Sequence, residues 1–406
     1  MKFVFIKKGC EEGKIIMGLH YKRKQLLKED LCNHCLGRQF AQVGTGLENY
    51  QRGYLIKNKE DISEEDFKQD NIPADLTPGG NCYLCQGFFN QLDKYTKLIV
   101  DTLKDYEFET ILIGTKPPES LKKEEEKLWF KYGRQRTEPF KGEFNRLLAK
   151  RVMLKLDIDS DLQQPDIQAI VDLTTDDLHL NYKPVFIYGQ YNKYVRDISQ
   201  TIWNYSQDSV QQVIQTIFLN RFKAVETKFH GAGREDLNVR CFGKREFVLE
   251  LVKPKKRSSD LEQITADLNQ SQDKVEVFNL QFVEAKQKRI IKEKKAAKIY
   301  RALVQLNKDV INQDLLNLDD LKGIVKQKTP SRVLQTRGDK IRTRTIYHIT
   351  AEIIASQKVE LIIKAEAGTY IKEFISGDQG RTKPNIAEFF NCQAECNKLD
   401  VISIDN

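Results

Sequence analysis

One carboxylate in the stretch from His230 to Phe247 lies among the residue types that nucleophilic chemistry requires. The sequence HGAGREDLNVRCFGKREF places Asp236 near four cations, which are Arg234, Arg240, Lys244 and Arg245. Opposite charge within a few ångströms lowers the pKa of a carboxyl group, so we expect Asp236 to stay ionised near neutral pH. Surface clusters of this kind are more often solvated ion pairs that contribute little. Gly231 and Gly233 favour a site instead, because glycine allows a tight turn and the close approach of a ligand.

Two pairs of cysteines have the spacing of a metal site. Cys32-x-x-Cys35 and Cys82-x-x-Cys85 each direct two thiolates at one centre, and together they complete the tetrahedral shell that structural zinc prefers. Buried thiols or disulfides are the alternative, but disulfides are uncommon in a chain without a secretion signal. A redox pair would need a thioredoxin-like βαβ unit, which the sequence does not indicate. We therefore expect structural Zn²⁺ on four cysteines, with His34 as a loop residue.

Length and composition indicate a globular chain of more than one domain. The 406 residues are 40% hydrophobic, which is enough for two or three separate cores. No apolar run approaches the roughly 18 residues of a membrane helix, and the apolar stretch at the N-terminus is too short for a secretory signal. We therefore expect a cytoplasmic protein with no membrane partner. The net charge of +8 is compatible with a polyanionic partner but does not identify one.

The first half of the chain is predicted to be an α+β domain. Between residues 95 and 194, apolar runs typical of strands alternate with segments of helical periodicity. The predicted elements are a strand over 109–114, helices over 120–129 and 144–152, and strands over 167–173 and 185–188. We expect one domain over 1–197 and a second over 198–406. One helix carries a row of cations that is either a solvated face or a nucleic-acid contact: Lys141, Arg146, Lys150, Arg151 and Lys155.

The second half contains the strand that follows Asp236. Ser209 and Gln212 form a capping box that opens an amphipathic helix. The apolar run 247–252 is typical of a strand, so Asp236 is predicted to lie on a loop that enters a sheet. Loops held by a rigid sheet commonly carry catalysis. The polar stretch after Arg257 is predicted to be a flexible crossing.

The last third of the chain is predicted to contain a basic pair of strands. The lysine-rich stretch 286–298 has a helical pattern that is expected to end at 299–304. Farther on, cations alternate with other residues over 340–345, which puts them on one face of a strand. These cations are Lys340, Arg342 and Arg344. The run 358–367 is expected to pair with this strand, and the two strands would form a basic cradle for RNA.

Several motifs in a fixed order resemble one enzyme family. They include HGAGRED at Asp236, KIYRALV at Tyr300, TPSRVLQTRGDKIRTRTIY and AGTYIKEFISGDQGRT. With LCNHCLGRQFA at the first cysteine pair, ILIGTKPP and PVFIYGQYNKYVRDISQTIW, they resemble the T-loop tRNA pseudouridine synthases of archaea and eukaryotes, the tenth pseudouridine synthase family. The resemblance runs nearly the whole chain, and independent motifs in the right order are highly specific.

The resemblance implies both a fold and an activity. The fold is α+β, with a zinc-binding, THUMP-like α/β domain followed by a pseudouridine synthase domain on a mixed, mainly antiparallel sheet. The activity is that of an isomerase that detaches uracil from ribose and rejoins it through carbon, without an organic cofactor. The expected partner is tRNA, through its T loop and stem, with uridine 55 and also uridine 54 as targets. The protein is expected to act as a monomer.

The resemblance also implies roles for particular side chains. Asp236 matches the family's essential aspartate, which attacks or stabilises the ribose C1′ or the base C6 and must be ionised for either task. Lys372 matches the basic position that pairs with this aspartate. Tyr300 matches the tyrosine that stacks on the target base, with a core tyrosine at a helix end as the alternative, and Tyr370 is expected to line the same pocket. Arg234 is expected to fill the gap left by the flipped uridine or to contact a phosphate.

The sequence departs from the family's pattern beside Asp236. The family tends to read GREDVDVRMLGTGRPF, whereas here Leu237 and Asn238 replace the usual residues. Asn238 removes a second acid near the nucleophile, so any role of that acid is absent. The segment 243–246 is one residue shorter and lacks the proline. The shorter turn is expected to leave Asp236 and Arg240 in register, with Arg240 contacting the substrate.

Other classes of RNA protein fit the sequence less well. A thiouridine synthetase needs a pyrophosphatase loop such as SGGxDS, and the string from Ser376 to Gly380 lacks this pattern. A methyltransferase needs a glycine-rich nucleotide loop, and Gly44-Thr-Gly46 is not followed by one. A non-catalytic zinc-containing tRNA-binding protein or RNA chaperone is the remaining alternative. It predicts that Asp236→Asn leaves all function intact.

Overall fold

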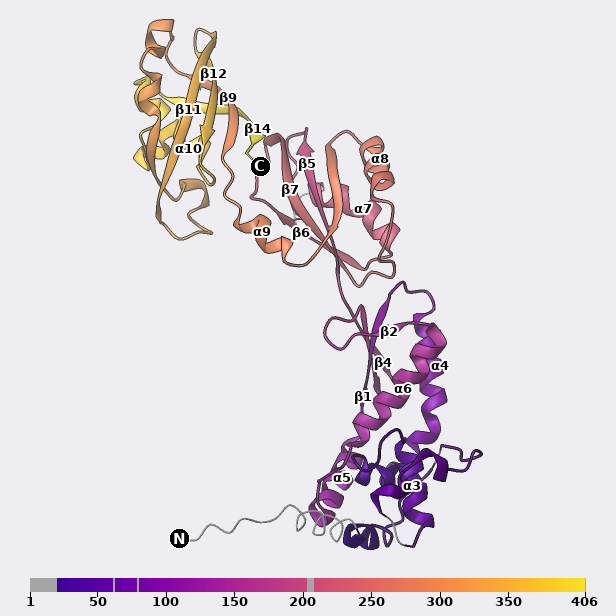
Figure 1. Cartoon of the computed structure of the whole chain (residues 1–406). Coiled ribbons are helices and arrows are strands. Elements are labelled where there is room, and N and C mark those ends of the chain that lie inside the picture. The colour runs from indigo at the N-terminus through magenta and orange to yellow at the C-terminus, as the bar shows by residue number, and fades with distance from the viewer. Residues whose placement is uncertain (1–19, 61–62, 79, 203–207, 406) are drawn as a thin grey trace, which may run out of the picture. The chain divides into compact units, whose positions relative to one another are not determined.

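The chain divides into two units that follow one another in the sequence (Figure 1). The computed structural model describes residues 20–60, 63–78, 80–202 and 208–405, and the division falls after Lys183. It precedes strand β5 (Val185–Lys193), which forms hydrogen bonds with strands β7 and β8 of the second unit. The boundary expected after residue 197 lies C-terminal to this division. The reason is strand pairing, which the sequence does not display and which assigns β5 to the second sheet.

The first unit contains a four-stranded sheet with the order β2-β1-β3-β4. Strand β1 (Thr110–Lys116) runs parallel to β2 (Asp159–Ser160) and β3 (Ile167–Asp172), and β3 pairs antiparallel with β4 (Leu178–Tyr182). Alternate side chains of β1 are buried, as expected for a strand with one face on a core. Strands β1 and β3 confirm the two predicted in this region.

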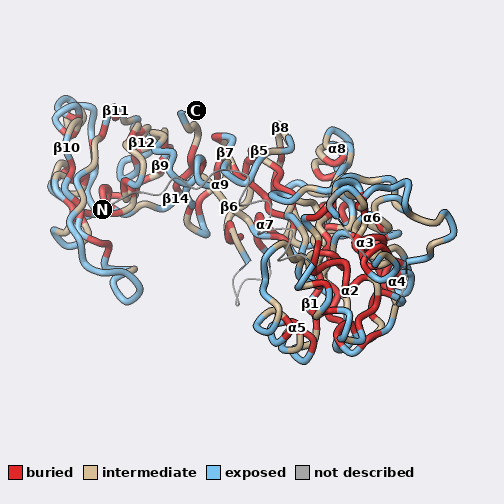
Figure 2. The backbone as a smooth tube through the Cα atoms, turned by 60° about the horizontal axis from the view of Figure 1, so that its bottom comes forward, coloured by how far each residue is buried: buried red, intermediate tan, exposed pale blue. Residues whose placement is uncertain are grey.

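The first unit also contains helices, and the first cysteine pair lies at the N-terminus of one of them. They are α2 (Asn33–Gly37), α3 (Asn49–Asn58), α4 (Leu92–Leu103), α5 (Glu119–Tyr132) and α6 (Phe140–Leu156). Helices α5 and α6 confirm the two helices predicted from periodicity, and α6 packs against both β1 and α4. Buried side chains of the sheet, these helices and the cysteine region form one continuous core, visible as buried stretches in Figure 2.

The second unit is built on a ten-stranded sheet. Its order is β13-β10-β11-β12-β9-β14-β7-β5-β8, with β6 also paired to β7. The strands after β5 are β6 (Glu226–Gly231), β7 (Val239–Val252), β8 (Val275–Val283), β9 (Lys298–Leu306), β10 (Gly323–Lys328), β11 (Ile341–Ala355), β12 (Lys358–Ala365), β13 (Thr382–Lys383) and β14 (Ala394–Ile404). Among these described strands, β14 and β7 are parallel and the other neighbours are antiparallel. The α+β class and the mixed, mainly antiparallel sheet are therefore confirmed.

Helices cover the two halves of this sheet with separate cores. Helices α7 (Val210–Phe222) and α8 (Leu261–Ser271) pack with β5 and β7 (Figure 1). Helices α10 (Ile371–Ser376) and α11 (Ile386–Phe389) pack with β9, β12 and β14. Helix α9 (Gln287–Glu293) contributes to a small third cluster with β5 and β7. None of the described helices has both the length and the apolar character needed to cross a membrane.

Two predictions for the second unit are wrong. The stretch after Arg257 is not a flexible crossing, because it contains α8, which is capped by Asp260 and buries Ile264 and Leu268. The helix expected over 286–304 ends at Glu293, and the following residues form β9. Every second residue of β9 from Tyr300 to Leu306 is buried, which is the periodicity of a strand. Tyr300 therefore does not end a helix.

A candidate active site at Asp236

Asp236 lies on the loop that joins β6 to β7. These strands pair antiparallel up to Gly231 and Phe247, so the sheet supports the loop from its β6 side. Gly233 has a φ of +79°, a conformation that glycine adopts without strain, and this bend directs the chain toward Asp236. The Val239 amide donates to the Asp236 carbonyl at 3.1 Å and closes the loop. The predicted position of Asp236 on a loop entering a sheet is confirmed.

Two cations from distant segments hold the Asp236 carboxylate. Lys372, in α10, places its Nζ 3.1 Å from Oδ2 of Asp236. Arg332, in a short turn after β10, places Nη2 3.2 Å from the same oxygen and Nη1 3.5 Å from Oδ1. The Asp236 side chain is nevertheless 38% exposed. The carboxylate is therefore oriented by two cations and still accessible to a substrate.

These cations lower the pKa of the Asp236 carboxyl. Desolvation raises the pKa of the Asp236 carboxyl, but the positive charges of Arg332 and Lys372 and the hydrogen bonds that they donate outweigh this effect. The pKa of Asp236 is consequently lowered from its ordinary value of 3.8. An ionised carboxylate at neutral pH follows, as the sequence predicts, but the cations responsible are not those next to it in the sequence.

Three of the four neighbouring cations expected around Asp236 have other partners. Arg245 pairs with Glu235, with Nε 2.8 Å from Oε2, and both side chains are buried. Arg240 forms a two-pronged ion pair with Asp400, at 3.0 and 2.7 Å. The Lys244 ammonium lies 4.6 Å from the centre of the Phe278 ring. Successive residues of β7 point to opposite faces of the sheet and are spaced by about 3.3 Å along the strand. Cations that are close to Asp236 in the sequence are therefore not brought together at its carboxylate.

Asn238 and Arg332 are site residues to which the sequence assigns no role. The Asn238 side-chain oxygen accepts a hydrogen bond from Lys372 Nζ at 2.7 Å, so Asn238 is a neutral partner of the lysine. Arg332 Nε also donates to Glu373 at 2.7 Å, which anchors the guanidinium beside α10. Arg332 stands 96 positions from Asp236, and only the quoted TPSR motif marks it in the sequence.

Tyr300 and Tyr370 lie on the same half of the sheet as Lys372. Tyr300 is 9% exposed, and desolvation raises its pKa to about 12, partly opposed by Arg245, so its hydroxyl stays protonated. Tyr300 pairs with Ile363 of β12 and Val401 of β14, in the half of the sheet that packs with α10. Tyr370 immediately precedes α10, and its ring lies 5.9 Å from the Arg342 guanidinium.

The remaining predictions beside Asp236 concern Arg234 and the shortened turn. Arg234 is exposed two residues before Asp236. The segment 243–246 is not a turn, because β7 continues through it with a bulge opposite β5. At the bulge, Lys244 has a φ of +48° and its amide donates to Asn192 Oδ1 at 2.9 Å. The roles of the individual site residues stay predictions.

The four predicted metal ligands meet in the first unit. The Sγ atoms of the cysteines at 32, 35, 82 and 85 all lie within 4.8 Å of one another and are buried. Cys85 Sγ is 3.7 Å from that of Cys32 and 3.6 Å from that of Cys82. Tetrahedral zinc–sulfur bonds of about 2.3 Å place sulfurs roughly 3.8 Å apart, whereas a disulfide would require about 2.05 Å. The cluster is therefore able to hold a metal ion.

His34 is not a loop residue, contrary to expectation. It lies in α2 and is buried, with its ring stacked on Phe89 at 4.0 Å. Its Nδ1 is 2.7 Å from Glu143 Oε1, which connects the first cysteine pair to α6. This nitrogen is directed to the carboxylate, so His34 supports the fold of the cysteine region.

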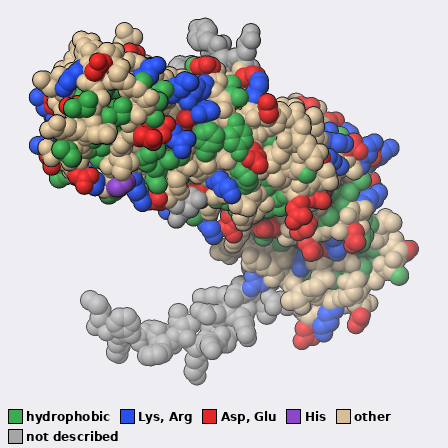
Figure 3. Space-filling view, turned by 90° about the horizontal axis from the view of Figure 1, so that it is seen from above, with side chains coloured by type: hydrophobic (Ala, Val, Ile, Leu, Met, Phe, Trp, Pro, Cys, Tyr) green, Lys and Arg blue, Asp and Glu red, His purple; other side chains and the backbone are tan. Residues whose placement is uncertain are grey.

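Several cations on the predicted basic face of α6 form ion pairs. On the predicted basic face of α6, Arg146 contacts Glu48 and Glu138, and Arg151 lies 3.6 Å from Asp93. On the face shown in Figure 3, Lys and Arg side chains are interspersed with Asp and Glu. These pairs favour the solvated-face interpretation of the α6 cations.

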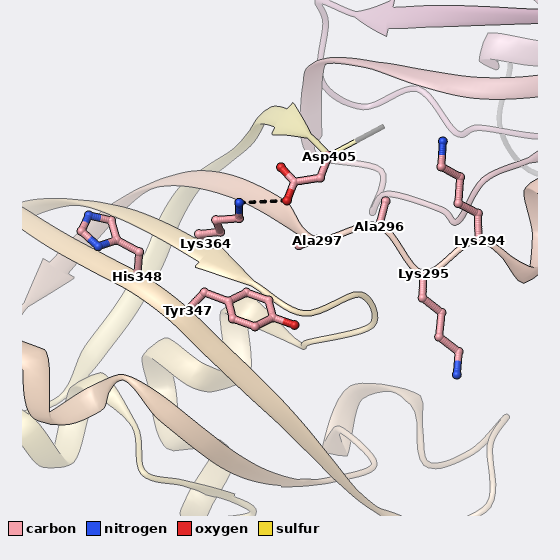
Figure 4. Close-up of a pocket in the computed structure, with 8 residues that line it drawn as sticks. All are labelled: Lys294, Lys295, Ala296, Ala297, Tyr347, His348, Lys364 and Asp405. Atoms are coloured by element: carbon pink, nitrogen blue, oxygen red, sulfur yellow. Dashed lines mark ion pairs between the residues drawn. The ribbon is translucent and has the colours of Figure 1, made fainter.

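An open pocket of about 650 Å³ lies elsewhere on the second unit (Figure 4). Its lining consists of Lys294, Lys295, Ala296, Ala297, Tyr347, His348, Lys364 and Asp405. Ile363 pairs with Tyr300 across the sheet and is buried in the core. The next residue, Lys364, points to the opposite face, so the pocket opens on that other face of the sheet. Lys364 pairs with Asp405 and Lys294 with Glu246, both at 2.8 Å. Its charge is mostly neutralised, and we assign the candidate active site to Asp236 instead.

Comparison with known proteins identifies the class of this chain. A family model described as the archaeal THUMP domain of Pus10 matches residues 95–172, and one described as the C-terminal domain of Pus10 matches residues 186–405. The tRNA pseudouridine synthase Pus10 of Pyrococcus furiosus is 36% identical over 387 residues, covering 94% of this chain and 97% of its own. That of Methanopyrus kandleri is 33% identical over 424 residues, with the same coverage of 94% and 97%.

These matches define a pseudouridine synthase, which is an isomerase. The chain belongs to the Pus10 family of tRNA pseudouridine synthases. Both the predicted family and the predicted enzyme class are therefore confirmed. Among solved structures, a chain of a Cbf5-Nop10-Gar1 complex covers 52% of this chain and 47% of its own at 18% identity, but its TM-score of 0.32 is too low to support an argument.

Proposed function

We propose that this protein converts uridine to pseudouridine in the T loop of tRNA, at position 55 and also at position 54, with Asp236 as the nucleophile. One observation carries the assignment of Asp236. Its carboxylate is partly exposed, its pKa is lowered, and it is held by both Lys372 and Arg332. The names of the relatives supply the RNA substrate class, and the sequence resemblance supplies the T loop.

The reaction needs an ionised carboxylate but no external reagent. The bond between ribose C1′ and uracil N1 breaks, a bond between C1′ and C5 forms, C5 loses a proton and N1 gains one. Composition is unchanged, so no oxidant or organic cofactor is required. Attack by Asp236 on C1′ or on the base C6 starts from the same negatively charged oxygen. Lys372 and Arg332 keep this oxygen charged and oriented before the substrate arrives.

Aromatic and cationic side chains near Asp236 are suited to hold an extruded base and its backbone. Tyr370 is partly exposed, and its hydroxyl accepts from Arg337 at 3.3 Å. Stacking of a base on an aromatic ring is worth about 1–3 kcal/mol. We propose Tyr370 and the exposed edge of Tyr300 as base contacts. Arg234 is suited either to replace the flipped uridine or to bind a phosphate, and Arg240 to contact the RNA with its exposed edge.

We further propose that the cysteine cluster binds structural Zn²⁺. Its support is the four buried sulfurs, whose separations suit tetrahedral thiolate ligation. All four ligand positions would be protein thiolates, so no position remains for a substrate. The metal would stabilise the fold of the first unit and take no part in isomerisation.

The decisive experiment maps pseudouridine on an unmodified tRNA transcript after incubation with the purified protein. Carbodiimide labelling and primer extension should give new stops at positions 55 and 54. Transcripts with cytidine at 55 or at 54 should lose the corresponding stop only. Stops outside the T loop would contradict the proposed target, and stops that persist with Asp236→Asn would contradict the proposed nucleophile.

A further inference from the structure

One segment contacts the loop that carries Asp236 along most of its length. The segment 191–200 begins at the end of β5 and makes side-chain or backbone hydrogen bonds to the loop 233–238. Two side chains donate to the first part of the loop: Gln200 Nε2 to the Gly233 carbonyl at 2.9 Å and the Tyr191 hydroxyl to Glu235 at 2.8 Å. Lys193 Nζ donates to the Asp236 and Leu237 carbonyls. The Asp197 amide donates to the Leu237 carbonyl at 3.0 Å, and Arg196 donates to the Asn238 carbonyl at 2.6 Å. We call this segment the loop clamp.

Lys193 is the central residue of the loop clamp. Its side chain is fully buried at the end of β5. Its Nζ lies 3.0 Å from the carbonyl oxygen of Ile198, 3.4 Å from that of Asp236 and 3.0 Å from that of Leu237. An ammonium group has three N–H donors, so the charged lysine matches these three acceptors one to one.

A buried lysine bonded to carbonyls requires an explanation beyond packing. Burial of an ammonium is costly unless the group is paired and hydrogen-bonded. The nearby carboxylate Glu235 is already paired with Arg245 at 2.8 Å, and both are buried. Lys193 is therefore satisfied mainly by backbone oxygens of the very residues that position the nucleophile. A methyl-terminated side chain of similar length would fill the space without this cost, but would leave those carbonyls unbound.

We propose that Lys193, supported by the loop clamp, is a positioning residue that fixes the backbone of Asp236 and Leu237 and so sets the location of the Asp236 carboxylate. This inference rests on the proposed role of Asp236 as nucleophile. The Lys372 and Arg332 contacts act on the carboxylate oxygens, whereas Lys193 acts on the main chain of the same residue. The side chain and the backbone of Asp236 are thus restrained independently.

The test replaces Lys193 by methionine and separates binding from chemistry. With unmodified tRNA transcript, Lys193→Met should bind with the Kd of the wild type and lose single-turnover rate on the order of 100-fold, as expected for a displaced reacting group. Hydrogen exchange measured by mass spectrometry should accelerate by about tenfold in peptides covering 194–200 and 233–240, because the Asp197 amide donates to the Leu237 carbonyl and the Val239 amide to the Asp236 carbonyl. An unchanged rate, or unchanged exchange in both peptides, would overturn the proposal.

Two further variants keep the test decisive. Ile214→Val trims a buried side chain of α7 in the core shared with Tyr191, so it lowers stability without touching the loop; it should leave rate and loop exchange as in the wild type. If it reproduced the Lys193→Met rate loss, a general loss of stability would explain that result in place of positioning.

If Lys193→Met does not fold, Tyr191→Phe should show a smaller loss of rate with faster loop exchange. Wild-type values for both measurements would refute the role of the loop clamp. If the wild type makes no pseudouridine, the proposed function fails, while loop exchange still decides whether Lys193 restrains the loop.

Discussion

The cysteine cluster of the first unit and the Asp236 site of the second differ in how far their ionisable groups are exposed. All four cysteines are buried, and their sulfurs lie within 4.8 Å of one another. Asp236 remains 38% exposed, and its cation partners come from positions 332 and 372. The sulfurs of the first site are buried, whereas the carboxylate of the second is accessible on one side.

This difference indicates what each site is built to do. Under the proposed zinc ligation, all four ligand positions are protein thiolates and none remains for a substrate, so the metal would contribute to stability. An accessible carboxylate with a lowered pKa is oriented by its cations and yet free to react. Perturbing the first site should therefore affect folding of its own unit, and perturbing the second should affect chemistry with little effect on folding.

The largest expected effect is loss of the first unit's fold on metal removal. Structural zinc contributes on the order of 10 kcal/mol in small sites, so chelation by a strong zinc ligand, or Cys85→Ser, should unfold the cysteine region. Circular dichroism and limited proteolysis should show this loss, while the second unit keeps its own cores. The exposed Lys295→Ser is the control. A cysteine variant with wild-type proteolysis would contradict a structural metal.

The next largest effect is on the chemical step, through Asp236→Asn. Removal of a nucleophile should lower the single-turnover rate by about 10⁴-fold or more. The carboxamide is nearly isosteric, so thermal stability and tRNA affinity should remain close to those of the wild type. Pseudouridine mapping measures the rate, and a filter-binding titration measures affinity. Retained activity of Asp236→Asn would contradict the proposed role of Asp236 as the nucleophile.

The cysteine cluster could be predicted from the sequence because its information is local. Two CxxC turns specify the ligands, and the fold has only to bring two turns together. The chemical site was predictable only in part. Asp236 stood out by motif and Lys372 by resemblance, whereas Arg332 and Lys193 converge on Asp236 through strand pairing that no local pattern displays. The same lack of pairing information explains why the helix expected over 286–304 ends at Glu293. It also explains why Arg240 and Arg245, which are close to Asp236 in the sequence, pair with Asp400 and Glu235 instead.

A smaller effect should appear in the pH dependence of the rate when one cation is removed. In the wild type, the lowered pKa of Asp236 keeps the carboxylate ionised well into the acid range, and the rate should fall only as pH drops through that pKa. Arg332→Gln removes a positive charge, so the pKa of Asp236 should rise and the acid limb of the single-turnover rate should move to higher pH. At neutral pH, the loss should be on the order of tenfold, reflecting poorer orientation.

The matched control for Arg332→Gln is Arg221→Gln. Arg221 also pairs with a carboxylate, that of Asp267 at 2.6 Å, but it lies on α7. Its removal should leave the acid limb unmoved. If the Arg332 variant also kept the wild-type limb, the electrostatic role assigned to Arg332 would be wrong, and Lys372→Met would show whether the lysine alone sets the charge of Asp236.

The smallest expected effect concerns Arg240, for which structure and sequence suggest different roles. Arg240 donates twice to Asp400; desolvation raises the pKa of Asp400, but Arg240 and Arg196 lower it overall. A lowered carboxyl pKa contributes stability that is present above the unfolded-state pKa and is lost as pH falls through the folded-state pKa. Arg240→Gln should therefore move acid unfolding to higher pH and cost about 1 kcal/mol at neutral pH, since the Arg240 side chain is 38% exposed and its charge is screened. Urea titrations at several pH values measure this change. A weaker tRNA affinity with unchanged stability would instead show that Arg240 contacts the RNA. The RNA-binding surface around Asp236 would then include this part of β7.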